Sequence, residues 1–320
     1  MNEFALIDAY FKRLSARTGA LLSVCHPELH ADLGIGDDCA LISVPNGQQL
    51  AVSSDTLVSG VHFPQHTSAF DIGYKALAVN LSDLAAMGAM PAWFSLCITL
   101  QDQTEGWVEA FCEGMAAVMQ ASPIQLIGGD TTKGPLSISI QVMGVVPKGA
   151  ALTRVGAQPG DEIYVSGRVG EAAQGLALAL STTAEQWSRA LDHEHLLARL
   201  NRPTPRVALG VALRGVASAC IDVSDGLLAD LNHMLTASQV GARVNVDAIP
   251  VASGQDPMHS ISAGDDYELC FTAPVSARQN IAAIAASLSL DVTAIGTITA
   301  ETGIVDQQHQ AITATGYQHF

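Results

Sequence analysis

Short acidic motifs recur along the chain, and most of them follow an apolar run and precede a turn or a helix. This arrangement predicts interleaved strands and helices with carboxylates gathered at their junctions. Only 14% of the residues are charged, so carboxylates set among apolar and glycine residues need partners where they are buried. The motifs are Gly36-Asp37-Asp38, Ser53-Ser54-Asp55, Asn80-Leu81-Ser82-Asp83, Gly128-Gly129-Asp130, Asp222-Val223-Ser224-Asp225-Gly226 and Gly264-Asp265-Asp266.

The charge balance indicates what those partners are. Lys and Arg together number 15 against 31 Asp and Glu, too few cations to pair with every carboxylate. Bound divalent cations would supply the missing charge, and Asp, Ser and backbone oxygens are suitable ligands for Mg²⁺. The sequence therefore indicates a metal-dependent enzyme that handles phosphates. The net charge of −16 argues against a nucleic-acid partner, which needs a basic surface.

Cysteine usage and the N-terminus bear on the compartment. The six cysteines stand singly, without a Cys-x-x-Cys pair, which argues against zinc or a disulfide framework and favours a reducing cytoplasm. The N-terminal Met1-Asn2-Glu3-Phe4 lacks a basic region, and polar residues interrupt every long apolar stretch. We therefore expect a cytoplasmic protein without a membrane partner.

Periodicity predicts two α/β domains, 1–148 and 149–320, of mixed strands and helices, with the boundary near Lys148-Gly149. Ser68 with Asp71 has the pattern of a capping box, and Gly88 ends the helix that follows. Predicted helices cover 4–17, 68–87, 107–120, 176–180 and a segment after 226. Predicted strands cover 49–53, 93–100, 124–127, 136–146, 162–166 and 216–221.

Each candidate site has a structural alternative. Gly128-Gly129-Asp130 is either a backbone nest for an anion or an ordinary turn closed by Asp. Ser224 is the expected N-cap of a helix whose N-terminus favours phosphate, although capping alone would explain Ser224 and Asp225. Capping does not explain Asp222, which tilts this motif toward metal binding.

Three further residues also have two interpretations. Asp83 is either a half-exposed surface residue or a ligand for a metal or a water. His62 is by default an ordinary histidine, although it follows a strand and lies near Asp55. Arg154 is by default a surface cation, although few arginines are available to meet a phosphate. The glycines at 167, 170 and 175 lack dinucleotide-fingerprint spacing, and the chain has neither a P-loop nor a Gly-x-Ser-x-Gly elbow.

Taken in order, the motifs resemble the thiamine-monophosphate kinase family, part of the superfamily of aminoimidazole ribonucleotide synthetase and selenophosphate synthetase. The resemblance covers nearly the whole chain, and its most specific part is the Asn-Leu-Ser-Asp helix together with Asp266-Tyr267-Glu268-Leu269. It departs from the family at Asp265, where Glu is usual, at Ala263, where Gly is usual, and in the tail, which reads Gly316-Tyr317-Gln318-His319-Phe320.

The resemblance implies phosphorylation of thiamine monophosphate by ATP, several Mg²⁺ ions and a homodimer whose first domains share a β-barrel. Its metal ligands would match Asp38, Asp55, Asp83, Asp130, Asp222 and Asp225, with Ser53 and Ser54 assisting. Its ATP-binding groups would match Gly129, Asp130, Arg154 and Ser224. Its thiamine phosphate site would match His62, Asp265 and Tyr317.

The chemistry itself requires no catalytic base or covalent intermediate. The acceptor is a phosphate monoester, mostly a dianion at neutral pH because its second pKa is about 6. The barrier is electrostatic repulsion between two phosphates, which divalent cations offset.

Two alternatives stay open. The first is another enzyme of the superfamily, although Cys25-His26-Pro27 does not resemble a selenophosphate synthetase site. The second is a non-catalytic protein that binds nucleotide or metal.

Overall fold

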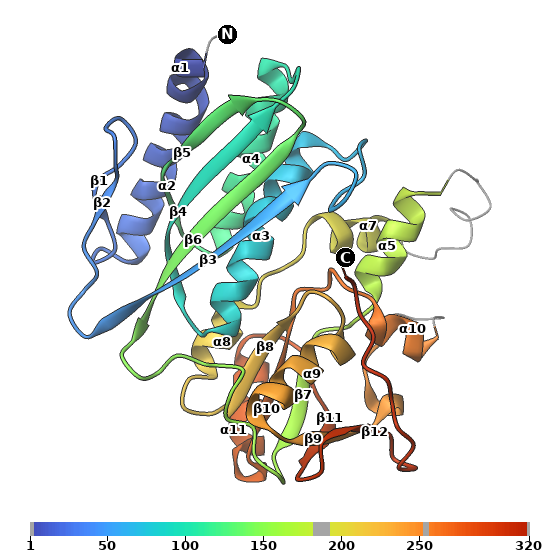
Figure 1. Cartoon of the computed structure of the whole chain (residues 1–320). Coiled ribbons are helices and arrows are strands. Elements are labelled where there is room, and N and C mark those ends of the chain that lie inside the picture. The colour runs from blue at the N-terminus through green and yellow to red at the C-terminus, as the bar shows by residue number, and fades with distance from the viewer. Residues whose placement is uncertain (1–2, 182–192, 252–255, 319–320) are drawn as a thin grey trace. The chain divides into compact units, whose positions relative to one another are not determined.

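The computed structural model describes residues 3–181, 193–251 and 256–318 (Figure 1). The chain forms two compact units: Met1–Leu84 with Ala89–Gly149, and Ala85–Gly88 with Ala150–Phe320. The expected boundary between 148 and 149 lies one residue from this division, whereas the assignment of 85–88 to the second unit was not expected. No helix in the described part of the chain has the length and apolar character needed to cross a membrane.

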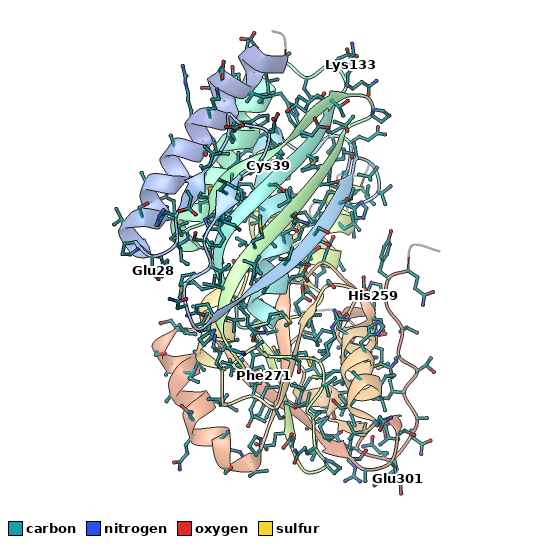
Figure 2. The ribbon with its side chains drawn as sticks, turned by 60° about the vertical axis from the view of Figure 1, so that its left-hand side comes forward. Glu28, Cys39, Lys133, His259, Phe271 and Glu301 are labelled. Atoms are coloured by element: carbon teal, nitrogen blue, oxygen red, sulfur yellow. The ribbon has the colours of Figure 1, made fainter. Side chains whose placement is uncertain are left out.

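The first unit is built on a four-stranded sheet of order β3-β6-β4-β5, in which only β4 and β5 run parallel. These strands are β3 (Gln48–Val58), β4 (Met90–Leu100), β5 (Gln125–Lys133) and β6 (Ser137–Pro147). A small antiparallel pair joins β1 (Ala31–Leu33) to β2 (Leu41–Ile42). Figure 2 labels Lys133, the last residue of β5.

Helices accompany this sheet (Figure 1). The N-terminal helical run comprises α1 (Glu3–Leu6), the π-helical turn Ile7–Phe11 and α2 (Lys12–Cys25), so the predicted helix over 4–17 is confirmed and continues further. The other two are α3 (Ala69–Ala86) and α4 (Glu105–Ala121). These two helices can pack closely because Gly73 has no Cβ. A Cβ at this position would lie 2.0 Å from the carbonyl oxygen of Phe111.

The predicted contact between Ser68 and Asp71 at the start of α3 is confirmed. The Ser68 hydroxyl donates to the Asp71 carboxylate (2.8 Å) and accepts from the Asp71 backbone N–H (3.1 Å). The apolar face predicted for this helix is buried at Leu77, Leu81 and Leu84. The cap and the apolar face thus determine which residues α3 turns toward the sheet.

The second unit contains a six-stranded sheet of order β12-β9-β11-β7-β10-β8, in which only β12 and β9 run parallel. Its strands are β7 (Glu162–Ser166), β8 (Ala219–Val223), β9 (Gly241–Val244), β10 (Glu268–Ala273), β11 (Val292–Thr299) and β12 (Gly303–Val305). Its helices are α5 (Glu171–Ala179), α7 (His193–Asn201), α8 (Val207–Ala212), α9 (Leu227–Ser238), α10 (Pro257–Ser262) and α11 (Arg278–Ser287), with 3-10 turns at Val246–Ala248 and Val275–Ala277.

The central strands of this sheet are buried on both faces. On one face Ile163 and Val165 of β7 pack in a core with α9, while Tyr164 packs on the other face in a core that includes residues of α8 and α11. Tyr164 stacks on Phe271 of β10 with ring centroids 5.2 Å apart, and Figure 2 labels Phe271 among these strands. The two-sided burial holds the end of β8 and the start of β10, to which the acidic loops are attached.

Two strands that carry acidic motifs, β3 and β5, are longer than the sequence predicts. Asp55 lies inside β3 and Asp130 inside β5, so the expectation that both acids follow the end of a strand is wrong. β3 is an edge strand, so one side of it pairs with no other strand of this sheet and can carry polar residues. In β5, glycine allows the chain to continue beside β4: Gly129 has φ +150°, and a Cβ there would lie 1.8 Å from the Leu96 oxygen.

Candidate active site

In the first unit, β3 and α3 bring two predicted acids together. Alternate residues of β3 point to one face, and on that face the Ser53 hydroxyl donates to Asp83 Oδ2 at 2.5 Å. The backbone N–H of Asp55 donates to Asn80 Oδ1 at 3.1 Å. Asn80 and Asp83 lie three residues apart on α3, so one helix face serves both contacts. Asp83 therefore belongs to a polar cluster rather than to an isolated surface position.

The electrostatics of this cluster favour a cation. Burial, followed by the negative charge of Asp83, raises the pKa of Asp55 from its ordinary value to about 6. A positive charge bound beside Asp55 and Asp83 would stabilise the ionised form of both carboxylates. A divalent cation would supply that positive charge.

Other predicted ligands of the first unit lie outside this contact. Strand alternation places the Ser54 side chain on the opposite face from Ser53 and Asp55, so a contribution from Ser54 would have to use its main-chain oxygen. Asp38 is exposed in a bend after β1, and its N–H donates to the Asp37 carboxylate (2.9 Å). Across the described residues, no three His, Cys, Asp or Glu side chains form a metal-binding group.

Gly129 and Asp130 lie in the middle of β5, opposite Leu96 and Cys97 of β4. Both are exposed. The close approach at Gly129 sets the path of the strand immediately before Asp130. The predicted anion nest in a turn is thus replaced by a glycine-bearing strand that presents an exposed carboxylate.

His62 is held in a defined tautomer. Its Nδ1 accepts the backbone N–H of Val58 at 3.0 Å, so Nδ1 carries no proton and Nε2 is the nitrogen able to donate. The carbonyl oxygen of His62 accepts a hydrogen bond from the ammonium of Lys75 (3.3 Å), a lysine that is only 2% exposed. This half-buried histidine is therefore oriented on both its ring and its backbone, as a phosphate-binding donor would need to be.

In the second unit, the loop between β8 and α9 corrects one expectation. The N-cap of α9 is Gly226, not Ser224. Glycine has no side chain that could cap the helix. The N–H groups of Ser224, Asp225 and Gly226 donate instead to one oxygen, Asp230 Oδ2, at 3.0, 3.1 and 3.1 Å. These N–H groups already have an anionic acceptor, so a phosphate is not expected to bind to them.

Asp230 is the residue that sequence reasoning missed. It is 3% exposed and lies on α9 among the buried Leu227, Leu228 and Leu231. Burial, followed by the charge of Asp225, raises the pKa of Asp230 to about 7, while the three backbone hydrogen bonds act in the opposite direction. A carboxylate within an otherwise apolar helix face was the available signal.

The turn over residues 264–267 lies directly against this loop. The N–H of Asp265 donates to the Ser224 oxygen and that of Tyr267 to the Val223 oxygen, both at 2.8 Å. Asp265 (φ +72°) and Tyr267 (φ +52°) occupy the left-handed region, which costs about 1–3 kcal/mol at a non-glycine residue. The Tyr267 hydroxyl donates to Asp265 Oδ1 at 3.0 Å. The surrounding bonds thus hold a strained turn that presents Asp265.

The C-terminal segment reaches the same loop. The N–H of Tyr317 donates to the Asp225 oxygen at 2.9 Å, and the Tyr317 side chain is 50% exposed. The preceding Gly316 approaches closely, since a Cβ there would lie 2.7 Å from that same oxygen. The structure therefore brings Asp225, Asp265 and Tyr317 together, as one neighbourhood of the second unit.

A buried network supports the turn from the other side. Asp266 is fully buried, and its carboxylate accepts the N–H of Gly170 (2.8 Å) at the start of α5. Burial raises the pKa of Asp266 to about 8, against the opposing effects of this hydrogen bond and of Arg199. Arg199 also donates to the Asp266 carbonyl oxygen at 3.1 Å.

Glu268 completes this network. It is fully buried and accepts hydrogen bonds from Arg206 (2.6 and 2.5 Å), Arg199 (3.0 Å) and the Ser166 hydroxyl (2.6 Å). A buried carboxylate is tolerated when charge-assisted bonds of this kind replace water. The sequence offered no local signal for this network, because its partners are 62 to 102 positions apart.

The other two predicted residues of the second unit are Asp222 and Arg154. Asp222 is buried near the end of β8 and pairs in register with Leu269. Arg154 is exposed; its carbonyl oxygen accepts from the Ser238 hydroxyl (3.1 Å), which also accepts the N–H of Gly156 (3.1 Å). The segment that carries the guanidinium is thereby anchored while its side chain faces solvent.

Comparison with known proteins decides the family. The AIR synthase related protein N-terminal domain matches residues 36–146, and the corresponding C-terminal domain matches residues 158–307. The thiamine-monophosphate kinase of Salmonella typhimurium is 45% identical across 100% of this chain and 98% of its own length. This chain belongs to the thiamine-monophosphate kinase family.

Solved structures agree with the family assignment. The crystal structure of thiamine-monophosphate kinase from Stenotrophomonas maltophilia is 47% identical, covers 98% of both chains and superposes with a TM-score of 0.85. AaThiL complexed with AMPPCP and TMP is 28% identical, covers 99% of this chain and 97% of its own, and has a TM-score of 0.78. The kinase family and its two-domain α/β fold, which the sequence motifs predicted, are confirmed.

Proposed function

We propose that this enzyme transfers the γ-phosphoryl group of ATP to the phosphate of thiamine monophosphate, giving thiamine diphosphate and ADP. Full-length identity of 45% to a thiamine-monophosphate kinase carries the proposal. The AaThiL complex, which contains AMPPCP and TMP, supports ATP as donor and the thiamine phosphate as acceptor. The motifs that carry the resemblance occur in both compact units.

The donor set fits Mg²⁺. Asp55 and Asp83 form an electrostatically coupled carboxylate pair, and the pKa of Asp55 is raised by burial and by Asp83. We propose these two residues, with Ser53, as the core of the metal site. The remaining ligands that we propose are Asp38, Asp130, Asp222, Asp225 and the main chain of Ser54. When bound, Mg²⁺ would offset the repulsion between donor and acceptor phosphates.

The protein groups then have positioning and electrostatic tasks. We propose that Gly129, Asp130, Arg154 and the Ser224 side chain hold ATP. Nε2 of His62 donates to the acceptor phosphate, and the Asp265 carboxylate attracts the thiamine cation. The Tyr317 ring contacts the thiazolium. No residue needs to remove a proton, because the attacking phosphate oxygen is already ionised at neutral pH.

Phosphorus NMR tests the reaction directly. ATP with Mg²⁺ is incubated with the protein and, in separate samples, thiamine monophosphate, thiamine or other phosphomonoesters. We expect the diphosphate and ADP signals only with thiamine monophosphate, and no turnover in excess EDTA. Phosphorylation of free thiamine at a comparable rate would contradict the mechanism, because that alcohol would need a base. Nucleotide binding without transfer would indicate a non-catalytic protein.

We also propose a homodimer in which the first units share a β-barrel. The edge strand β3 supports this proposal, since Leu50, Val52 and Val58 on it are 38%, 53% and 36% exposed. Light scattering should give a dimer mass that falls on Val52→Lys. Val24→Lys, at an 82% exposed position of α2, is the matched control and should leave the mass unchanged. A monomeric wild-type chain would contradict the dimer.

The cytoplasm is the location that we propose. All six cysteines are free, with three of them exposed, which suits a reducing compartment.

A further inference from the structure

The loop over residues 223–226 is bonded on both sides of its backbone. Three successive N–H groups, of Ser224, Asp225 and Gly226, point to a single oxygen of Asp230. Three successive carbonyl groups, of Val223, Ser224 and Asp225, accept from elsewhere in the same unit. The loop is therefore held as a unit rather than by one cap.

The partners of the carbonyl groups are the segments that carry the proposed substrate residues. The Ser224 oxygen accepts from Asp265, the Val223 oxygen from Tyr267 and the Asp225 oxygen from Tyr317, over 2.8 to 2.9 Å. Glycine allows this closeness: a Cβ at Gly264 would lie 2.4 Å from the Ser224 oxygen. A displacement of the loop would consequently carry the substrate-binding segments with it.

The proposed ATP and metal contacts lie on the same loop. The side chains of Ser224 and Asp225 are the proposed contacts for ATP and metal, whereas their carbonyl groups accept from the N–H groups of Asp265 and Tyr317. The Asp230 carboxylate acts on the backbone of the loop, because it accepts hydrogen bonds from three of its N–H groups. Its carboxylate is 3% exposed, so it is unavailable as a direct ligand for a phosphate in solvent.

We infer that Asp230 is a positioning residue that holds one loop in place for both substrates of the reaction. The inference rests on the proposed function for its kinetic consequence, but not for its structural one. A residue that contacts one ligand should affect the KM of that ligand. Asp230 should affect the KM of ATP and of thiamine monophosphate together, because both depend on the same backbone.

The structural consequence is tested first, on the full-length protein without ligands. Hydrogen exchange measured by mass spectrometry should show protected amides at 224–226 in the wild-type protein and rapid exchange there in Asp230→Ala. Asp230→Asn retains an oxygen acceptor and should restore part of the protection. Unchanged exchange at 224–226 in Asp230→Ala would overturn the inference whether or not the protein is a kinase.

The kinetic consequence is measured with Mg²⁺–ATP and thiamine monophosphate. Asp230→Ala should raise both KM values about tenfold or more, the scale of a lost charge-assisted hydrogen bond, with a smaller joint rise for Asp230→Asn. Ser224→Ala should raise only the KM of ATP, and Asp265→Ala mainly that of thiamine monophosphate. A rise confined to one KM in Asp230→Ala would overturn the shared-loop inference.

Asp161→Asn is the matched control. Asp161 is also a buried carboxylate of the second unit, 7% exposed, and accepts from the N–H of Gln158 and the hydroxyl of Ser218. Its loss should lower stability without the joint rise in KM; an equal joint rise would show a general structural effect and overturn the inference.

If Asp230→Ala does not fold, Asp230→Ser takes its place, since the shorter hydroxyl cannot bridge three N–H groups. Wild-type exchange and KM values in Asp230→Ser would likewise overturn the inference.

Discussion

The two units present most of their proposed acidic residues in different ways; the exceptions are Asp38, in a bend of the first unit, and Asp222, inside β8 of the second. In the first, Asp55, Asp83 and Asp130 project from a strand, a helix and a strand, so regular backbone sets their positions. In the second, Asp225 and Asp265 lie in loops, which are held by backbone hydrogen bonds and by the buried carboxylate of Asp230. Regular elements make a site tolerant of distant change, whereas a loop site depends on its supporting bonds. The comparison predicts where substitutions act directly and where they act through backbone.

The largest effect tests whether acids of the two units serve the same chemistry. Asp130→Asn in the first unit and Asp222→Asn in the second should each lower kcat by about two orders of magnitude or more, as for loss of a principal electrostatic contact. Both proteins should remain folded, which circular dichroism and thermal melting can verify. Near wild-type turnover in either variant would remove that residue from the site and make the two units unequal contributors.

The next effect concerns backbone tolerance. Gly129→Ala places a Cβ 1.8 Å from the Leu96 oxygen at φ +150°, within two paired strands that cannot move apart cheaply. We expect a loss of about 3 kcal/mol of unfolding free energy, seen as a lower Tm. Gly264→Ala in the second unit meets the Ser224 oxygen at 2.4 Å without a positive φ, and a loop can yield, so about 1 kcal/mol is expected.

Gly128→Ala is the control for this pair of substitutions. It adds a Cβ to the same strand with nothing within 4 Å, and should change the Tm little. A larger loss for Gly264→Ala than for Gly129→Ala would reverse the contrast between rigid strand and adjustable loop.

The contrast between regular elements and loops also explains which features of the structure could be predicted from the sequence. Helix limits followed from local chemistry, as the Ser68–Asp71 cap and the leucine face of α3 show. Ser53-Ser54-Asp55 and Gly128-Gly129-Asp130 were expected at strand ends because Gly, Ser and Asp favour turns. Sheet pairing overrides that preference, since β3 is an edge strand and Gly129 permits close strand approach.

The second unit was harder to predict for a different reason. The N-cap assigned to Ser224 is wrong because Asp230, one helical turn beyond Gly226, binds the loop amides in its place. The bonds of Glu268 to Arg199 and Arg206 join segments far apart in the chain, which periodicity cannot reveal. The motif residues themselves were visible in the sequence, whereas the groups that hold them were not.

A third prediction separates substrate contacts in the two units. Asp265→Ala and Tyr317→Ala should each raise the KM of thiamine monophosphate about tenfold, more than that of ATP, through lost charge attraction and ring contact. His62→Ala in the first unit should do the same, because Nε2 no longer binds the acceptor phosphate. Tyr317→Phe keeps the ring and should stay close to wild type. A rise limited to the KM of ATP would show that the two ligands occupy the opposite positions.

The smallest expected effect is on the stability of the metal-free protein. Burial and Asp83 raise the pKa of Asp55 from 3.8 to about 6, so between these values the folded state holds a proton that the unfolded state has released. Stability therefore falls as the pH rises through this window, and the full penalty applies above pH 6. In chelator at pH 8, Asp55→Asn should be more stable than wild type by about 1–2 kcal/mol, after allowance for solvent screening.

The difference between Asp55→Asn and the wild type should become small near pH 4, where Asp55 of the folded protein is mostly protonated, and added Mg²⁺ should stabilise the wild type more than the variant. Asp102→Asn is the control, because that side chain is 82% exposed and its replacement should change the stability little. Thermal melts across pH 4 to 8 measure each case. A destabilised Asp55→Asn at pH 8 in chelator would mean that the Asp55 carboxylate is stabilised by the fold itself. The first unit would then hold its acid by supporting bonds, as the second does, and the contrast between the two sites would fail.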